Sequence, residues 1–368
     1  MKPRTDWMAW SLAALAGLLV VFNLFSPERS SAASFSQAEL LNAQSLLYFP
    51  LVQLEAPAFY PNDPAFAGGL QWPLERMRIP WGWPISTGKP EIIIAVVDFG
   101  VAEEHPDLAG RLLPYTSYLK PGTPARGKDV KGWNTSLAGI MAANTDNGLG
   151  IAGITREVKI LSVQIGIQEA SIQADAIRFA GSYPGVAVVI LDLQDPYSNI
   201  YLSAAVRDLY RQGVVVVMPG GDCGGDDFDP HLCSYKNEIL YPAGGSNVLA
   251  VSATDAADQI AGFSTSGNFI DVSAPGVEIY STGQAGGYDT HSSSLMAAGY
   301  VASVIALVRA AHPEYTMDQV VQAVLCRSTD LGEPGWDPVY GMGRVDAYRA
   351  LNLGAPPVPC RNWNLNSQ

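Results

Sequence analysis

The sequence predicts an α/β fold of three layers, in which helices cover both faces of a doubly wound, mostly parallel sheet. The first observation is a series of short, continuous apolar runs without polar alternation, typical of strands buried on both faces. The second is that helix-like stretches separate the runs, as in right-handed βαβ units. The predicted strands cover residues 92–97, 160–165, 186–191, 214–217 and 248–251. The predicted helices cover residues 135–143, 172–180, 202–212 and 295–311.

The composition supports a globular protein with a sizeable core. Of 368 residues, 48% are hydrophobic and 15% are charged, which excludes a disordered chain. The formal net charge is −13, with 22 Lys and Arg against 35 Asp and Glu. Because no basic stripe is available to displace counterions from phosphates, we expect no nucleic-acid partner.

The N-terminal residues 1–29 have the features of an export signal. Lys2 and Arg4 precede an apolar run at 7–25. At about 1.5 Å per residue, a helix of that length spans about 28 Å, close to the thickness of a bilayer core. The small residues Ser31, Ala32 and Ala33 also offer a signal-peptidase site. We therefore expect either a membrane anchor with an extracytoplasmic domain or a cleaved signal and secretion.

The remaining chain divides into three parts. Residues 30–60 contain Ser, Ala and Pro with one apolar stretch at 40–51, and are predicted to be a linker. Residues 61–355 hold the strand and helix pattern, and residues 356–368 form a C-terminal tail.

Four cysteines agree with an oxidising compartment. Cys223 and Cys233 lie ten residues apart, and a bridge between them would leave Cys326 and Cys360 to pair. The sequence alone permits three pairings, and unpaired thiols also remain possible. No CxxC spacing is present, so we predict no zinc site.

Several motifs then occur in order between residues 60 and 353. They are DFGVAEEHPDL from Asp98, GWNTSLAG from Gly132, VVVVMPGGD ending at Asp222, SAPGVEIYST from Ser273, and SSLMAAGYVAS from Ser293. The last motif of the series is GWDPVYGMGRVDAYRAL at residues 335–351. This series resembles the subtilisin-like serine proteases, which implies a subtilisin-like fold and a Ser-His-Asp catalytic site.

The resemblance places non-catalytic residues at most of the catalytic positions. Asp98 matches the catalytic Asp, but Trp133 falls on the general-base His and Leu295 on the nucleophilic Ser. Asp222 falls on the Asn that stabilises the oxyanion. An indole has no basic lone pair and leucine has no nucleophilic atom. The resemblance therefore implies a catalytically degenerate member, with no functional catalytic residue and no metal in its site.

One alternative keeps an active enzyme with non-standard catalytic residues. A slip of one residue would make Ser294 the nucleophile, and His291 lies close enough in sequence to act as its base. However, the slip rotates the following helix by about 100° relative to its match with the core.

Three further expectations concern the surroundings of this site. We expect the Trp133 indole N–H to replace the lost histidine by donating to Asp98. The segment 192–196 carries bulky and charged residues where substrate backbone would pair, so it is either loop drift or a groove that receives a partner segment by strand addition. The acidic residues Asp226, Asp227 and Asp229 could bind Ca²⁺, although such a run is more often solvated.

We therefore expect an exported pseudoprotease that binds or scaffolds a protein partner without peptide hydrolysis and without a cofactor. The alternative function is an active subtilisin-like endopeptidase.

Overall fold

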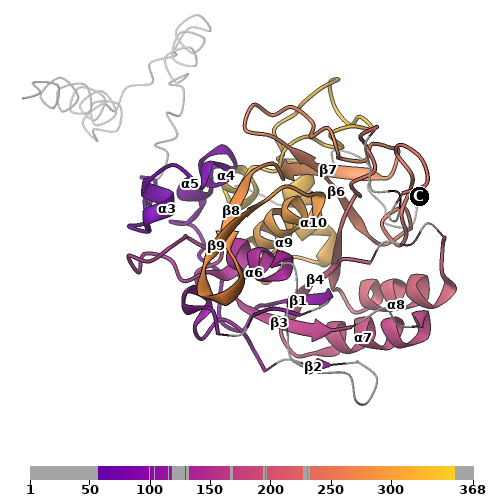
Figure 1. Cartoon of the computed structure of the whole chain (residues 1–368), viewed down its shortest axis with the longest axis horizontal. Helices are drawn as coiled ribbons and strands as arrows, with labels where there is room; N and C mark the ends of the chain where they lie inside the picture. Colours follow the sequence, from indigo (N-terminus) through magenta and orange to yellow (C-terminus); the bar gives the residue numbers. More distant parts are fainter. Residues whose placement is uncertain are drawn as a thin grey trace, which may run out of the picture. The chain divides into compact units, whose positions relative to one another are not determined.

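A computed structural model of the chain describes residues 57–352, with gaps at 99, 103, 115, 118–128, 130–131, 166–168, 194, 196, 227–229 and 231–232. Its centre is a sheet of seven parallel strands in the order β2-β3-β1-β4-β5-β6-β7 (Figure 1). The strands are β1 (Ile93–Asp98), β2 (Thr116–Ser117), β3 (Lys159–Gln164), β4 (Val186–Leu191), β5 (Val215–Pro219), β6 (Leu249–Thr254) and β7 (Ile270–Pro275). After β7, the chain forms a separate two-stranded antiparallel sheet of β8 (Ile279–Thr282) and β9 (Tyr288–His291).

Helices cover both faces of the main sheet, which confirms the three-layer α/β prediction. The longer helices are α6 (Trp133–Ala142), α7 (Ala170–Ser182), α8 (Ile200–Arg211), α9 (Ser294–Ala311) and α10 (Met317–Leu325). The short ones are α3 (Pro64–Ala67), α4 (Trp72–Arg76), α5 (Ile79–Gly82) and α11 (Ala347–Leu351), with 3-10 turns at Pro106–Leu108 and Gln284–Gly286. The sequence did not predict the short helices, α10, β2 or the strands from β7 onward.

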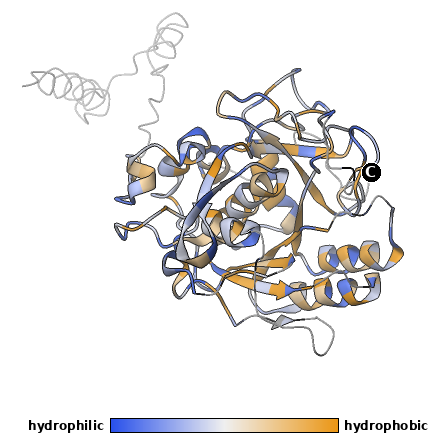
Figure 2. Ribbon diagram, in the orientation of Figure 1, coloured by the Kyte–Doolittle hydropathy of each residue, from blue (hydrophilic) through white to orange (hydrophobic). Residues whose placement is uncertain are grey.

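Each strand supplies apolar side chains to two cores. Along β1, Ile94 and Val96 join the core that contains α9, whereas Ile93, Ala95 and Val97 join the core of α7 and α8. Because side chains alternate along a strand, a strand between two helical layers must be apolar throughout. Figure 2 shows that the outer helices α7 and α8, in contrast, carry both hydrophobic and hydrophilic residues.

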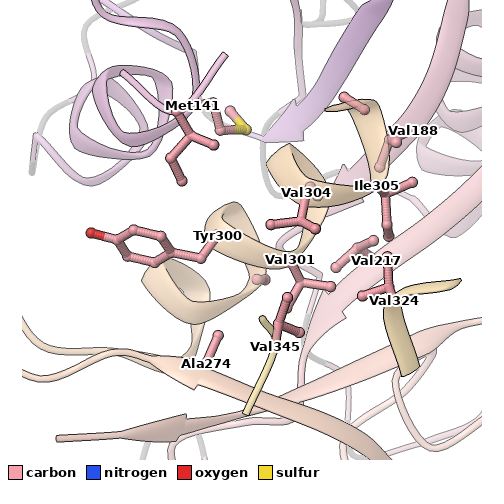
Figure 3. Packing of buried hydrophobic residues seen from close by; sticks show 14 of the residues in the cluster. Met141, Val188, Val217, Ala274, Tyr300, Val301, Val304, Ile305, Val324 and Val345 are labelled. Carbon is pink, nitrogen blue, oxygen red and sulfur yellow. The ribbon is translucent and has the colours of Figure 1, made fainter. Parts of the chain in front are cut away.

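Helix α9 forms the centre of the larger core. Val301, Val304 and Ile305 pack towards Val188 of β4 and Val217 of β5 (Figure 3). Among the described residues, α9 is the helix long and apolar enough to span a membrane, but 89% of it is buried inside the protein. It is therefore a core helix. The apolar run at 7–25, the linker and the tail lie outside the described residues.

The disulfide between Cys223 and Cys233 is present, with a Cα–Cα distance of 5.8 Å. Cys326 is also disulfide-bonded. Cys360, its expected partner, lies outside the described residues.

Candidate functional site

Asp98 lies at the C-terminal end of β1, as the sequence predicts. β1 pairs with β3 on one side and β4 on the other, so the strand order reverses there. Crevices outside the carboxyl ends of strands at such a switch point are the usual binding sites of open α/β sheets. By the alternation along β1, the buried Asp98 side chain is on the face of Ile94 and Val96, towards the layer of α6 and α9.

Trp133 is the first residue of α6. It follows Gly132, whose φ of 77° is a left-handed conformation that glycine adopts without steric cost. Its partly buried indole packs against the core of α9 and lies 5.2 Å from the ring of His291 between centroids. The aromatic ring thus fills the place where the resemblance puts an imidazole. The predicted hydrogen bond from the indole to Asp98 stays a prediction.

Close packing fixes the orientation of α6. The Ser136 hydroxyl donates to the Thr282 carbonyl at 2.6 Å, and the Ser281 hydroxyl donates to the Ser136 carbonyl at 2.7 Å. A Cβ on Gly139 would lie 2.2 Å from Oγ1 of Thr282, so only glycine permits this approach of α6 to β8. The position of Trp133 therefore follows from contacts along the whole helix.

Leu295 lies in the first turn of α9 and belongs to the hydrophobic core, with 2% of its surface exposed. Its backbone N–H donates to Oγ of Ser293 at 3.1 Å, since Ser293 is the N-cap residue of α9. Ser293 was not predicted as a capping residue, although a serine directly before an apolar helix is a standard capping signal.

Asp222 binds the same helix terminus. Its Oδ2 accepts from the Ser293 hydroxyl at 2.7 Å, and its Oδ1 accepts from the Ser294 backbone N–H at 2.9 Å. The disulfide at Cys223 and the bond from the Cys223 N–H to the Thr265 hydroxyl, at 3.0 Å, hold the adjacent chain in place. The N–H groups of Ser294 and Leu295, which at a free helix terminus could bind an anion, therefore both have internal acceptors.

Burial raises the pKa of the Asp222 carboxyl above its usual value, although the Ser293 hydroxyl and the Ser294 N–H oppose the shift. The raised pKa means that the folded state disfavours the ionised carboxylate. Relative to an Asp222→Asn variant, the wild-type chain should therefore lose stability as the pH rises from about 4 through the shifted pKa. At higher pH the difference should stay constant.

Urea unfolding of both proteins at several pH values between 4 and 8 measures this difference. A difference that is independent of pH, or that favours the wild type more as the pH rises, would contradict the raised pKa.

The alternative pair of Ser294 and His291 is not assembled. Ser294 is completely buried, and its hydroxyl, although near the Asp222 carboxylate, meets no partner with hydrogen-bond geometry. Nε2 of His291 is buried and also lacks a hydrogen-bond partner, with Oδ2 of Asp289 at 3.9 Å. No hydrogen bond therefore joins the hydroxyl to the imidazole.

The segment after β4 is partly engaged within the protein. Asp195 exchanges two backbone hydrogen bonds with Tyr241, at 3.1 and 2.7 Å, in an antiparallel bridge. Asp192 and Leu193 are half-buried, whereas residues 194 and 196 lie outside the described part. Just beyond, Tyr197, Ile200 and Tyr201 are 77%, 79% and 56% exposed.

The acidic stretch shows no calcium-type geometry in its described part. The highly exposed Asp226 forms an ion pair with Lys236 at 2.9 Å. Asp227 and Asp229 lie outside the described residues. No group of three or more metal-ligating His, Cys, Asp or Glu side chains occurs within the described part of the chain.

Comparison with known proteins gives one consistent result. Residues 89–343 match the model of the subtilase family, peptidase S8. Thermitase from Thermoactinomyces vulgaris is 34% identical over 80% of this chain and 99% of its own length. A thermophilic serine proteinase from Bacillus sp. (strain AK1) is 31% identical over 82% of this chain and 73% of its own. The minor extracellular protease Epr of Bacillus subtilis is 33% identical over 76% of this chain and 41% of its own. The order of the motifs, the parallel sheet and these relatives agree, and the chain belongs to the subtilase family.

Proposed function

We propose that this subtilase is an exported pseudoprotease that binds a polypeptide without hydrolysing it. The observation that carries the proposal is the N-terminus of α9. There the core residue Leu295 replaces the nucleophile, and the N–H groups of Ser294 and Leu295 are bonded to Asp222 and Ser293.

Each feature removes one requirement of acyl transfer. A serine mechanism needs a hydroxyl, a base within hydrogen-bond reach and donors for the developing oxyanion. In subtilisin, a relative, loss of either the serine or the histidine alone costs about 10⁶ in turnover. Loss of one oxyanion donor costs about 10² to 10³, and the Asp222 carboxyl, whose oxygens accept from Ser293 and Ser294, has no amide N–H to donate to an oxyanion.

The proposed binding rests on apolar side chains that are exposed just beyond the segment after β4. The exposed residues Tyr197, Ile200 and Tyr201 follow the segment that would pair with a peptide backbone. Exposed aromatic and aliphatic side chains of this kind are typical anchors for protein partners. The disulfide supports an oxidising compartment outside the cytoplasm.

A fluorophosphonate probe tests the proposed lack of hydrolysis. The purified chain should show no labelling and no casein hydrolysis above background, whereas the thermophilic serine proteinase of Bacillus sp. (strain AK1), at the same concentration, should be labelled. Labelling that disappears in a Ser294→Ala variant would instead establish the active enzyme with non-standard residues.

Site-specific photocrosslinking tests the proposed binding. A photoreactive benzoylphenylalanine in place of Tyr197 should crosslink to a defined polypeptide in the cells that produce the chain. The same residue in place of the exposed Glu333 is the matched control. Identical products at both positions, or none at position 197, would contradict a partner at this surface.

A further inference from the structure

A second concave site lies among the helices α3, α4 and α5, and none of the degenerate catalytic residues lines it. The pocket has a volume of about 510 Å³, and Ala256 also lines it. Three aromatic side chains line it, Phe66, Trp72 and Trp81, each of them half-buried. Its polar lining consists of Gln71, Glu75 and Arg76.

The aromatic side chains belong to a larger cluster of rings. Tyr60, which is 55% exposed, contacts Phe66 at 6.1 Å and Trp81 at 6.3 Å between ring centroids. The next ring, Phe59, already binds a cation, because the Arg156 guanidinium lies 4.4 Å from its centroid. This cluster thus contains one internal cation–π contact next to a pocket with further exposed ring surface.

The three polar side chains of the pocket differ in whether they already have a hydrogen-bond or ion-pair partner within the protein. The Gln71 amide is buried and satisfied at both ends by the backbone of Ala152, with distances of 2.8 Å. Arg76 forms an ion pair with Asp258, which Arg344 also contacts. Among the described residues, nothing pairs with the exposed carboxylate of Glu75.

We propose that this pocket binds the cationic side chain of a lysine or arginine in a partner polypeptide. The rings would hold the ammonium or guanidinium group by cation–π attraction, and Glu75 would supply the opposite charge. The net charge of −13 favours the approach of a basic partner. The competing ligand is an acidic group. Asp258 is paired with both Arg76 and Arg344, so it does not fully neutralise the charge of Arg76, which lines the pocket.

Blocked tripeptides with a single variable side chain test this proposal. The full chain, in a non-ionic detergent, is titrated with acetyl-Gly-Lys-Gly-amide, and affinity is measured by saturation-transfer NMR of the peptide. Norleucine in place of lysine keeps the aliphatic stem without the ammonium group and should bind about 5- to 30-fold more weakly. Arginine should bind like lysine, and glutamate should not bind.

Two variants locate the site. Glu75→Gln and Trp81→Leu should each weaken lysine binding severalfold, and circular dichroism confirms that each remains folded. The matched control Glu91→Gln, an exposed carboxylate outside the pocket, should leave binding unchanged.

The proposal is overturned if norleucine binds as well as lysine, if glutamate binds instead, or if no peptide binds. It is also overturned if phosphocholine binds and the lysine peptide does not, because the ligand would then be a lipid headgroup. None of these results depends on hydrolysis, so they are independent of the proposed lack of activity.

Discussion

The triple variant Trp133→His, Leu295→Ser, Asp222→Asn should hydrolyse p-nitrophenyl acetate about 10² to 10³ times faster than the unaltered chain. The three changes restore a base, a nucleophile and a neutral oxyanion donor, while Asp98 is already buried at the end of β1. In subtilisin the complete catalytic triad raises turnover by about 10⁶. We expect a smaller gain here, because the side chains around position 133 pack against an indole and will not hold the new imidazole in the best orientation. A small activated ester avoids the altered segment after β4.

The gain should be strongly non-additive. Leu295→Ser alone, and Trp133→His alone, should each remain at background, because a hydroxyl without a base and a base without a hydroxyl are both inactive. Adding Asp98→Asn to the triple variant should remove most of the gain, since the histidine would lose the carboxylate that orients it. Ester hydrolysis and fluorophosphonate labelling measure both effects.

Two outcomes would contradict the assignment of positions. The first is a triple variant that folds, as judged by circular dichroism, but gains no activity. The second is an Asp98→Asn change that has no effect on that activity.

The fold class could be predicted from the sequence alone, because the apolar runs and the helix-like stretches between them are both local patterns. Continuous apolar runs located β1, β3, β4, β5 and β6 to within about three residues at each end, and β1 ends at Asp98 as expected. By contrast, α4, α5 and α11 have only four or five residues each. Elements this short have no complete hydrophobic period, and tertiary contacts decide whether they form.

The site was predictable only in part. The motifs predicted which residues correspond to the catalytic positions, namely those at 98, 133, 222 and 295, because this correspondence needs only the order and spacing of residues along the chain. They did not give the contacts between distant segments, such as Asp222 with Ser293 or Trp133 with His291. Such contacts depend on how loops from different strand ends converge, which no local pattern encodes. Asp222 thus proved to bind a helix terminus, a structural role beside its unsuitability for an oxyanion site.

At the start of α9, the neighbouring residues Ser294 and Leu295 should differ in how much their side chains contribute to stability. Leu295→Ala should lower the free energy of unfolding by about 2 to 5 kcal/mol, because it leaves a cavity in the main core. Ser294→Ala should change it by less than about 1 kcal/mol, because the lost hydroxyl is buried without a hydrogen bond and alanine favours the helix.

Urea unfolding of the two variants provides this comparison, with each serving as the control for the other. If position 295 were instead a vestige of a reactive site, its side chain would be replaceable with little cost. A loss below about 1 kcal/mol for Leu295→Ala would therefore contradict its place in the core. A loss of several kcal/mol for Ser294→Ala would show that its hydroxyl has a partner that matters. The expected pattern would mean that the position which the resemblance assigns to the nucleophile stabilises the fold, since its aliphatic side chain is buried in the core, where a reactive hydroxyl would have no access to substrate.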